Sequence, residues 1–204
     1  MAFVRTVRAW AVVHNTGTGL LTLSVVALAS LLFADTTMAG IGPFRFLTPV
    51  STLLLLPAVA GVGAAVACVS GHRLPLPDPA RAHAARAAWA LAWTVLAILA
   101  ANVGLVSSSG TSFSAITRNV VIYLALSLVP VSFGQASLAW APVFAYTMAA
   151  MLFGHAANAD RFSYYWWAVV MRGESTAAQM ITAASLLALG LTVYVLNPGR
   201  RIRT

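Results

Sequence analysis

Long apolar segments with almost no charged residue dominate this sequence and restrict what it can fold into. Hydrophobic residues make up 60% of the chain and charged residues 8%. A segment of about 20 apolar residues fits the hydrocarbon core of a bilayer better than it fits a soluble core. The sequence therefore predicts an all-α, polytopic integral membrane protein with about six transmembrane helices, in which 1–204 form a single transmembrane domain. The apolar blocks lie at about 18–34, 50–69, 87–106, 120–133, 138–153 and 180–196.

The fourth and fifth blocks are shorter than the others. A short block can belong to a helix that is tilted, broken at a proline, or extended by the polar turn beside it. Pro130 and Pro142 are the positions at which a break would fall.

The basic residues of the chain lie mostly at the ends of the apolar blocks. Twelve basic residues, all arginine, stand against 4 acids, so the formal net charge is +8. Arginines at block ends contact anionic lipid headgroups and set the orientation of the protein in the membrane. Because this role explains the basic charge, we expect no nucleic-acid partner. If the N-terminus is cytoplasmic, eight arginines lie in inside segments and four in outside segments. This excess favours a multi-pass protein with both termini in the cytoplasm. The inside set is Arg5, Arg8, Arg73, Arg81, Arg86, Arg200, Arg201 and Arg203, and the outside set is Arg45, Arg118, Arg161 and Arg172.

The first 16 residues form an amphipathic pattern. Phe3, Val7 and Trp10 share one helical face, and Arg5 and Arg8 flank it. This pattern predicts a short helix at 1–16 that lies in the membrane interface. The alternative is the frayed beginning of a longer first span.

The segment 72–86 predicts a helical corner on the cytoplasmic side. Three prolines force an extended approach, after which Asp78 suits an N-cap and Pro79 suits the first helical position. The helix that follows could continue into the third span. A basic corner of this kind can dock a soluble partner, and the alternative is simple positive-inside anchoring. The docking residues would be Pro79, Arg81, His83 and Arg86.

The segment 154–179 is polar and rich in aromatic residues. Tyrosine and tryptophan favour the headgroup level of a membrane, so we expect one or two short helices along the outer leaflet. Local neutralisation could pair Asp160 with Arg161 and Arg172 with Glu174. The segment is an outer gate in one interpretation and an aromatic belt in the other. The gate residues would be Asp160, Arg161, Tyr164, Tyr165, Trp166, Trp167, Arg172 and Glu174.

Few polar residues interrupt the blocks. Asn102 and Gln135 could line a translocation path, although hydrogen bonds between helices are the more common role of such residues. Gly61 and Gly63 allow close helix approach, either within a packed bundle or at a dimer seam.

The sequence lacks the residues that several kinds of chemistry require. Cys68 has no second cysteine for a disulfide, and no His/Cys cluster has metal-ligand spacing. No acidic pair lies inside a block, and no phosphate-binding loop is present. We therefore expect no enzyme activity, no bound cofactor and no metal in this chain.

The order of these segments resembles that of the six-span membrane subunit of bacterial ABC-type exporters, by layout and not by motif. The resemblance implies that Pro79 to Arg86 form a coupling element and that Asp160 to Glu174 form outer-leaflet helices. It also implies a nucleotide-binding ATPase subunit that holds ATP and Mg, and a second membrane subunit that is a homodimer partner or a paralogue. The location would be the bacterial cytoplasmic membrane, in contact with its lipids.

The implied function is ATP-driven export of an amphipathic cargo, a peptide, lipid or antibiotic, by alternating access. Two other classes stay open at this point. The chain could be a non-transport scaffold or assembly subunit of a larger complex, or an integral lipid-modifying enzyme. The scarcity of charge inside the blocks favours a scaffold over an enzyme.

Overall fold

The computed structural model describes residues 14–41, 44–69, 79–108, 110–155 and 164–197. The expected interfacial helix at 1–16 falls almost entirely outside these ranges, and so do Asp78, Asp160 and Arg161. Within them the chain is mostly helical. The α-helices are α2 (Thr16–Leu32), α3 (Thr52–Ala67), α4 (Pro79–Asn102), α5 (Phe113–Ser132), α6 (Ala141–Phe153) and α7 (Ala177–Leu196). The short 3₁₀ turns are η1 (Val103–Val106), η2 (Ala136–Leu138) and η3 (Val169–Met171), and the strands are β1 (Thr37–Ile41) and β2 (Phe44–Ser51).

Each of the six apolar blocks overlaps one α-helix. Among the described residues, four stretches of helix are long and apolar enough to cross a membrane, which indicates a membrane protein. The helices α2 and α3 are apolar but shorter, with 17 and 16 residues. The four long stretches are Ala82–Val106, Phe113–Ser132, Ala136–Phe153 and Ala177–Leu196.

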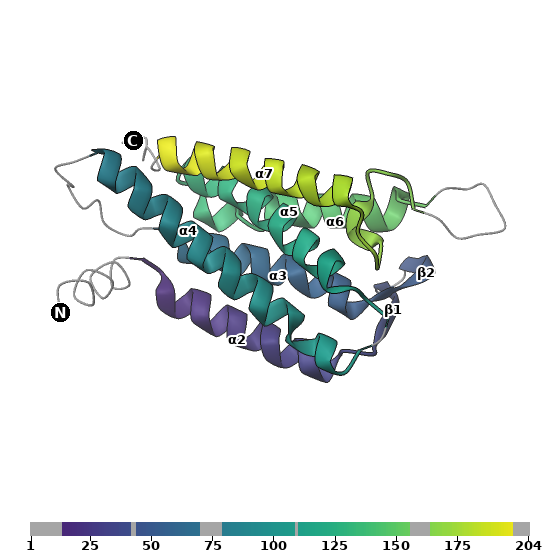
Figure 1. Cartoon of the computed structure of the whole chain (residues 1–204). Helices are drawn as coiled ribbons and strands as arrows, with labels where there is room; N and C mark the ends of the chain where they lie inside the picture. Colours follow the sequence, from purple (N-terminus) through teal and green to yellow (C-terminus); the bar gives the residue numbers. More distant parts are fainter. Residues whose placement is uncertain (1–13, 42–43, 70–78, 109, 156–163, 198–204) are drawn as a thin grey trace.

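The helices lie side by side in one elongated bundle, and the chain runs back and forth along it (Figure 1). The strands β1 and β2, the turn η1 and the connection before α7 gather at one end, which we call the hairpin end. The helices α2 and α4 begin at the opposite end, and α7 finishes there; we call this the α4-start end.

Helix α5 is the centre of the bundle. In the most apolar 18 residues of this helix 72% are buried, against 22% in the corresponding parts of the spans that contain α6 and α7. Small residues let its neighbours come close to its backbone: a Cβ added at Gly61 of α3 would lie 2.8 Å from the Leu124 nitrogen, and one at Gly190 of α7 would lie 3.0 Å from the Ala125 oxygen. Such close approach maximises van der Waals contact between helices. Gly61 therefore serves packing within the chain.

The helices of the two short blocks do not begin where the blocks begin. Helix α5 begins at Phe113, seven residues before the block, because the Ser112 hydroxyl caps it by accepting from the Ala115 nitrogen at 3.2 Å. Pro130 lies in the last turn of this helix, and Pro142 lies in the first turn of α6. The prediction of a break at either proline is therefore wrong. The prediction that a polar turn extends the helix is confirmed for α5.

The hairpin formed by β1 and β2 is an addition to the predicted all-α fold. The two strands are antiparallel, and Thr37 pairs with Ser51. Two contacts join the residue before β1 to the residue after β2. The Thr52 nitrogen donates to the Thr36 oxygen at 3.0 Å, and the two threonine hydroxyls lie 2.8 Å apart. Pairing between strands satisfies backbone groups of a segment that is too polar and too short for a span.

Candidate functional site

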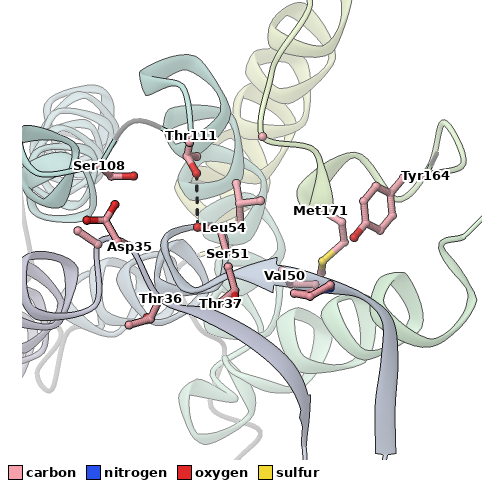
Figure 2. Close-up of a pocket in the computed structure, with 14 residues that line it drawn as sticks. Asp35, Thr36, Thr37, Val50, Ser51, Leu54, Ser108, Thr111, Tyr164 and Met171 are labelled. Atoms are coloured by element: carbon pink, nitrogen blue, oxygen red, sulfur yellow. Dashed lines mark hydrogen bonds between the residues drawn. The ribbon is translucent and has the colours of Figure 1, made fainter. Parts of the chain in front are cut away.

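A pocket of about 400 Å³ opens at the hairpin end of the bundle (Figure 2). Its walls come from the end of α2, the hairpin, the start of α3, the connection between η1 and α5, and the connection before α7. The lining residues are Ala34, Asp35, Thr36, Thr37, Pro49, Val50, Ser51, Leu54, Ser108, Gly110, Thr111, Tyr164, Met171 and Gly173.

The pocket has a polar side and an apolar side. Figure 2 shows Asp35 and Ser108 facing the same space, with Ser51 and Thr111 beside them. The Thr111 hydroxyl donates to the Ser51 hydroxyl at 3.4 Å. Across the pocket lie Val50 and Met171, with Tyr164 beyond them. The site can therefore hold a molecule that has both a polar and an apolar part.

Next to the pocket lies a buried arginine, Arg118 of α5, whose side chain is 0% exposed. Its guanidinium makes five hydrogen bonds, all to neutral oxygens. Nε and Nη2 donate to Asn119 Oδ1 at 3.1 and 3.0 Å, and Nη2 also donates to the Arg172 carbonyl at 2.9 Å. Nη1 donates to the Glu174 carbonyl at 2.7 Å and to Gln179 Oε1 at 3.0 Å. A guanidinium has five N–H groups, so each can be used here.

Asn119 extends this polar cluster towards α3. Its Nδ2 donates to the Val170 carbonyl at 2.7 Å and to the Leu54 carbonyl at 3.3 Å. Arg118 and Asn119 together bind backbone oxygens of α3 and of residues 170–174, and a side chain of α7. The cluster fixes the positions of two pocket walls, because Leu54 and Gly173 line the pocket.

Further hydrogen bonds hold the connection between α6 and α7 against the bundle. The Tyr146 hydroxyl donates to the Trp167 carbonyl at 2.7 Å, and the Ser112 nitrogen donates to the Gly173 carbonyl at 3.0 Å. The Tyr165 nitrogen donates to the Gly154 carbonyl at 2.8 Å. Residues 164–176 are thus a packed part of the bundle.

The structure places six of the eight predicted gate residues in this connection. Trp166 is 83% exposed and Tyr165 is 43% exposed, while Tyr164 and Trp167 are half-buried. One three-residue 3₁₀ turn, η3, stands where one or two short helices were expected. The aromatic exposure agrees with a belt, and the gate role stays a prediction.

The expected pairing of Arg172 with Glu174 is wrong. The Arg172 side chain donates instead to the Tyr164 carbonyl, and the Glu174 side chain is exposed. Within the part of the chain that the structure describes, no ion pair joins the two. The backbone carbonyls of both residues accept from Arg118.

The predicted docking residues lie at the α4-start end, far from the pocket along the bundle (Figure 1). Helix α4 begins at Pro79 and runs without a break to Asn102, so the predicted helix start and its continuity with the span are confirmed. Arg81, His83 and Arg86 all lie in its first turns, and the side chains of His83 and Arg86 are half-buried. Their docking role stays a prediction.

The two residues predicted to line a path lie in different surroundings. Asn102 ends α4 and is 9% exposed; its Nδ2 donates to the Ile98 carbonyl at 2.8 Å and to the Thr117 hydroxyl of α5 at 3.4 Å. Gln135 is exposed in the turn between α5 and α6, just after Gly134, whose φ is 78°. Gln135 therefore lies in a turn between two helices and not within a span, because α5 ends at Ser132. No structural observation tests the path role of either residue.

Sequence reasoning missed the cluster of Arg118 and Asn119. Arg118 was counted among arginines of an outside loop, since block four begins only at Val120. The signal was present in Ser112, a good N-cap that moves the helix start back and places Arg118 inside the helix.

No protein-family model matches this chain, and neither a curated protein nor a solved structure is significantly similar to it.

Proposed function

We propose that this chain is the membrane subunit of an ATP-driven ABC-type exporter in a bacterial cytoplasmic membrane. Two subunits, identical or paralogous, would enclose a path for an amphipathic cargo such as a peptide, a lipid-linked molecule or an antibiotic. A separate ATPase subunit would bind ATP and Mg and would drive alternating access. The chain would cross the membrane six times, with both termini in the cytoplasm.

The observation that carries this proposal is the continuous helix α4. Its 24 residues correspond to about 36 Å, which exceeds the hydrocarbon thickness of about 30 Å. The excess would lie at the start of the helix, where Arg81, His83 and Arg86 are found. A push on these first turns would be transmitted along one rigid element to η1 and the hairpin end.

The tightly bonded hairpin end supports a rigid-body motion. Arg118 and Asn119 join α3, α5 and α7 to residues 170–174. Separation of α5 from α7 and the connection before it, within one subunit, would break several buried or half-buried hydrogen bonds, each of which is costly to leave unmade. In this proposal the outer side opens between two subunits, and the connection before α7 moves with its own bundle.

The test is purification of the intact complex from its native membrane in a mild detergent, with identification of every subunit. We expect an ATPase with a phosphate-binding loop to co-purify in a fixed ratio. Purification in a fixed ratio with other membrane proteins and without an ATPase would overturn the proposal and favour a scaffold or assembly subunit. Lipid turnover by the chain alone would favour a lipid-modifying enzyme.

A further inference from the structure

Asp35 occupies a position that helix stability does not explain. It follows the C-terminal end of α2, whose C-cap is Phe33. The backbone dipole places partial negative charge at this end of a helix, so a carboxylate there is unfavourable and a basic residue would be preferred. Asp35 is also one of only 4 acids in a chain with 12 arginines.

The Asp35 carboxylate is exposed towards the pocket and is available to a ligand. Among the described residues it has no hydrogen bond or ion pair, and it is the single charged side chain among the residues that line the pocket. Ser108 faces the same space (Figure 2). A carboxylate with neighbouring hydroxyls accepts several N–H groups from a cationic group.

The opposite wall suits an apolar group. Val50, Leu54 and Met171 are at most 3% exposed and line the pocket. The volume of about 400 Å³ is at the small end of the range for small-molecule sites, which is roughly 300–1,000 Å³. The pocket therefore fits a small molecule that carries one positive charge on a short apolar body.

The walls of this pocket are held in place before any ligand arrives. Asn119 binds the Leu54 carbonyl, and Arg118 binds the Arg172 carbonyl next to Gly173. All five Arg118 donors point to protein oxygens, so this cation is not directed at a ligand. A site that is fixed in advance loses less conformational entropy on binding.

We propose that the pocket at the hairpin end binds an ammonium-bearing molecule, with the ammonium group at the Asp35 carboxylate and the apolar part against Val50, Leu54 and Met171. The ammonium could belong to a soluble amine or to the headgroup of phosphatidylethanolamine. This site is independent of the exporter proposal, because binding requires no ATPase.

The first test compares two probes of similar shape that differ in the polar group, a charged ammonium in one and a neutral hydroxyl in the other. The purified chain in dodecyl maltoside is titrated calorimetrically with phenethylammonium chloride and with 2-phenylethanol, and the heat of empty micelles is subtracted. We expect phenethylammonium to bind about tenfold more tightly or better, since a charge-assisted bond is lost with the alcohol. Equal affinities for the two probes would overturn the proposal, whatever any variant does.

The second test removes the charge of the site. Asp35→Asn keeps the shape of the side chain and should weaken phenethylammonium binding about tenfold or more. The matched control is Glu174→Gln, which changes an exposed acid at the same end of the bundle that does not line the pocket. The control should stay within about twofold of the wild type. Unchanged binding in Asp35→Asn, with elution from size exclusion as for the wild type, contradicts the proposal.

A competition experiment identifies the source of the ammonium group. Phosphatidylethanolamine and phosphatidylglycerol are added separately to the micelles. Displacement of the probe by phosphatidylethanolamine alone supports a lipid headgroup as the ligand, and displacement by neither lipid supports a soluble amine. Equal displacement by both lipids would contradict recognition of an ammonium group.

Discussion

Arg118 Nη1 donates to Gln179 Oε1 at 3.0 Å, and the same oxygen accepts from the Thr176 nitrogen at 3.2 Å. Gln179 is the third helical residue of α7 and closes a capping box with Thr176, whose hydroxyl accepts from the Gln179 nitrogen at 3.3 Å. The start of α7 is therefore fixed to the second turn of α5. Arg118 lies in the N-terminal half of its own helix, where the dipole does not stabilise a cation, so its hydrogen bonds account for its position.

Removal of the Arg118 side chain should strongly destabilise the protein. Arg118→Ala leaves three buried or half-buried oxygens without their donor, at Asn119, Arg172 and Glu174, and removes one of the two donors to Gln179 Oε1. The free energy of unfolding should fall by about 3 kcal/mol or more. The measurement is thermal or denaturant unfolding in detergent, followed by tryptophan fluorescence.

Glu174→Ala is the matched control for this variant. It removes an exposed carboxylate and keeps the carbonyl that Arg118 binds, so the change should stay within about 0.5 kcal/mol. A loss in Glu174→Ala as large as the loss in Arg118→Ala would mean that Arg118 depends on that carboxylate and would contradict the bonding scheme.

Asn119 should control how firmly the connection before α7 is held. Asn119→Ala removes the donor to the Val170 and Leu54 carbonyls and the acceptor for Arg118. Local opening of residues 170–174 should become more frequent, and trypsin should cleave after Arg172 several times faster than in the wild type. Cleavage is followed by mass spectrometry of the fragments. An unchanged rate after Arg172 would show that Asn119 does not hold this segment.

The close contact of α3 with α5 should not tolerate a methyl group at Gly61. A Cβ there would lie 2.8 Å from the Leu124 nitrogen and 2.9 Å from the Tyr123 carbonyl carbon, both of which are backbone atoms. Gly61→Ala should therefore lower stability by about 1–3 kcal/mol. Gly17 of α2 has no such neighbour within 4 Å, so Gly17→Ala should be neutral or stabilise by up to about 1 kcal/mol. Equal effects of the two substitutions would refute the packing argument.

Orientation in the membrane can be tested by labelling with a maleimide that does not cross it. Ala39 is exposed in β1 at the hairpin end, and Ser137 is exposed in η2 at the opposite end. In whole cells Ala39→Cys should react and Ser137→Cys should react only after permeabilisation. The native Cys68 is 2% exposed and should add little background. The reverse pattern would invert the topology that the arginine count favours.

The sequence predicted the helices well because the length of an apolar block is a local property. The start of α4 could also be predicted, since Pro79 favours the first position of a helix without reference to distant residues. The start of α5 was misjudged at Val120, although the local cap Ser112 marks it.

What the sequence could not predict depends on contacts between distant residues. The pairing of Thr37 with Ser51 requires a register that no periodicity specifies in so short a hairpin. The oxygens around Arg118 are more than 50 residues away along the chain, apart from that of Asn119, and most are backbone carbonyls that carry no signature in the sequence. The pocket at Asp35 is also formed by residues that are distant along the chain. The sequence therefore shows only that Asp35 is an acid next to the end of the first apolar block.

The most direct test of the central claim is co-purification of an ATPase with a variant of the α4-start end. Arg81, His83 and Arg86 are replaced together by alanine, and a control variant replaces Arg200, Arg201 and Arg203 of the C-terminal segment by alanine. The exporter account predicts that the wild type and the control retain the ATPase, while the α4 variant loses it and still elutes as a folded protein. An ATPase that stays bound to the α4 variant, or that is absent from the wild type, would contradict the account.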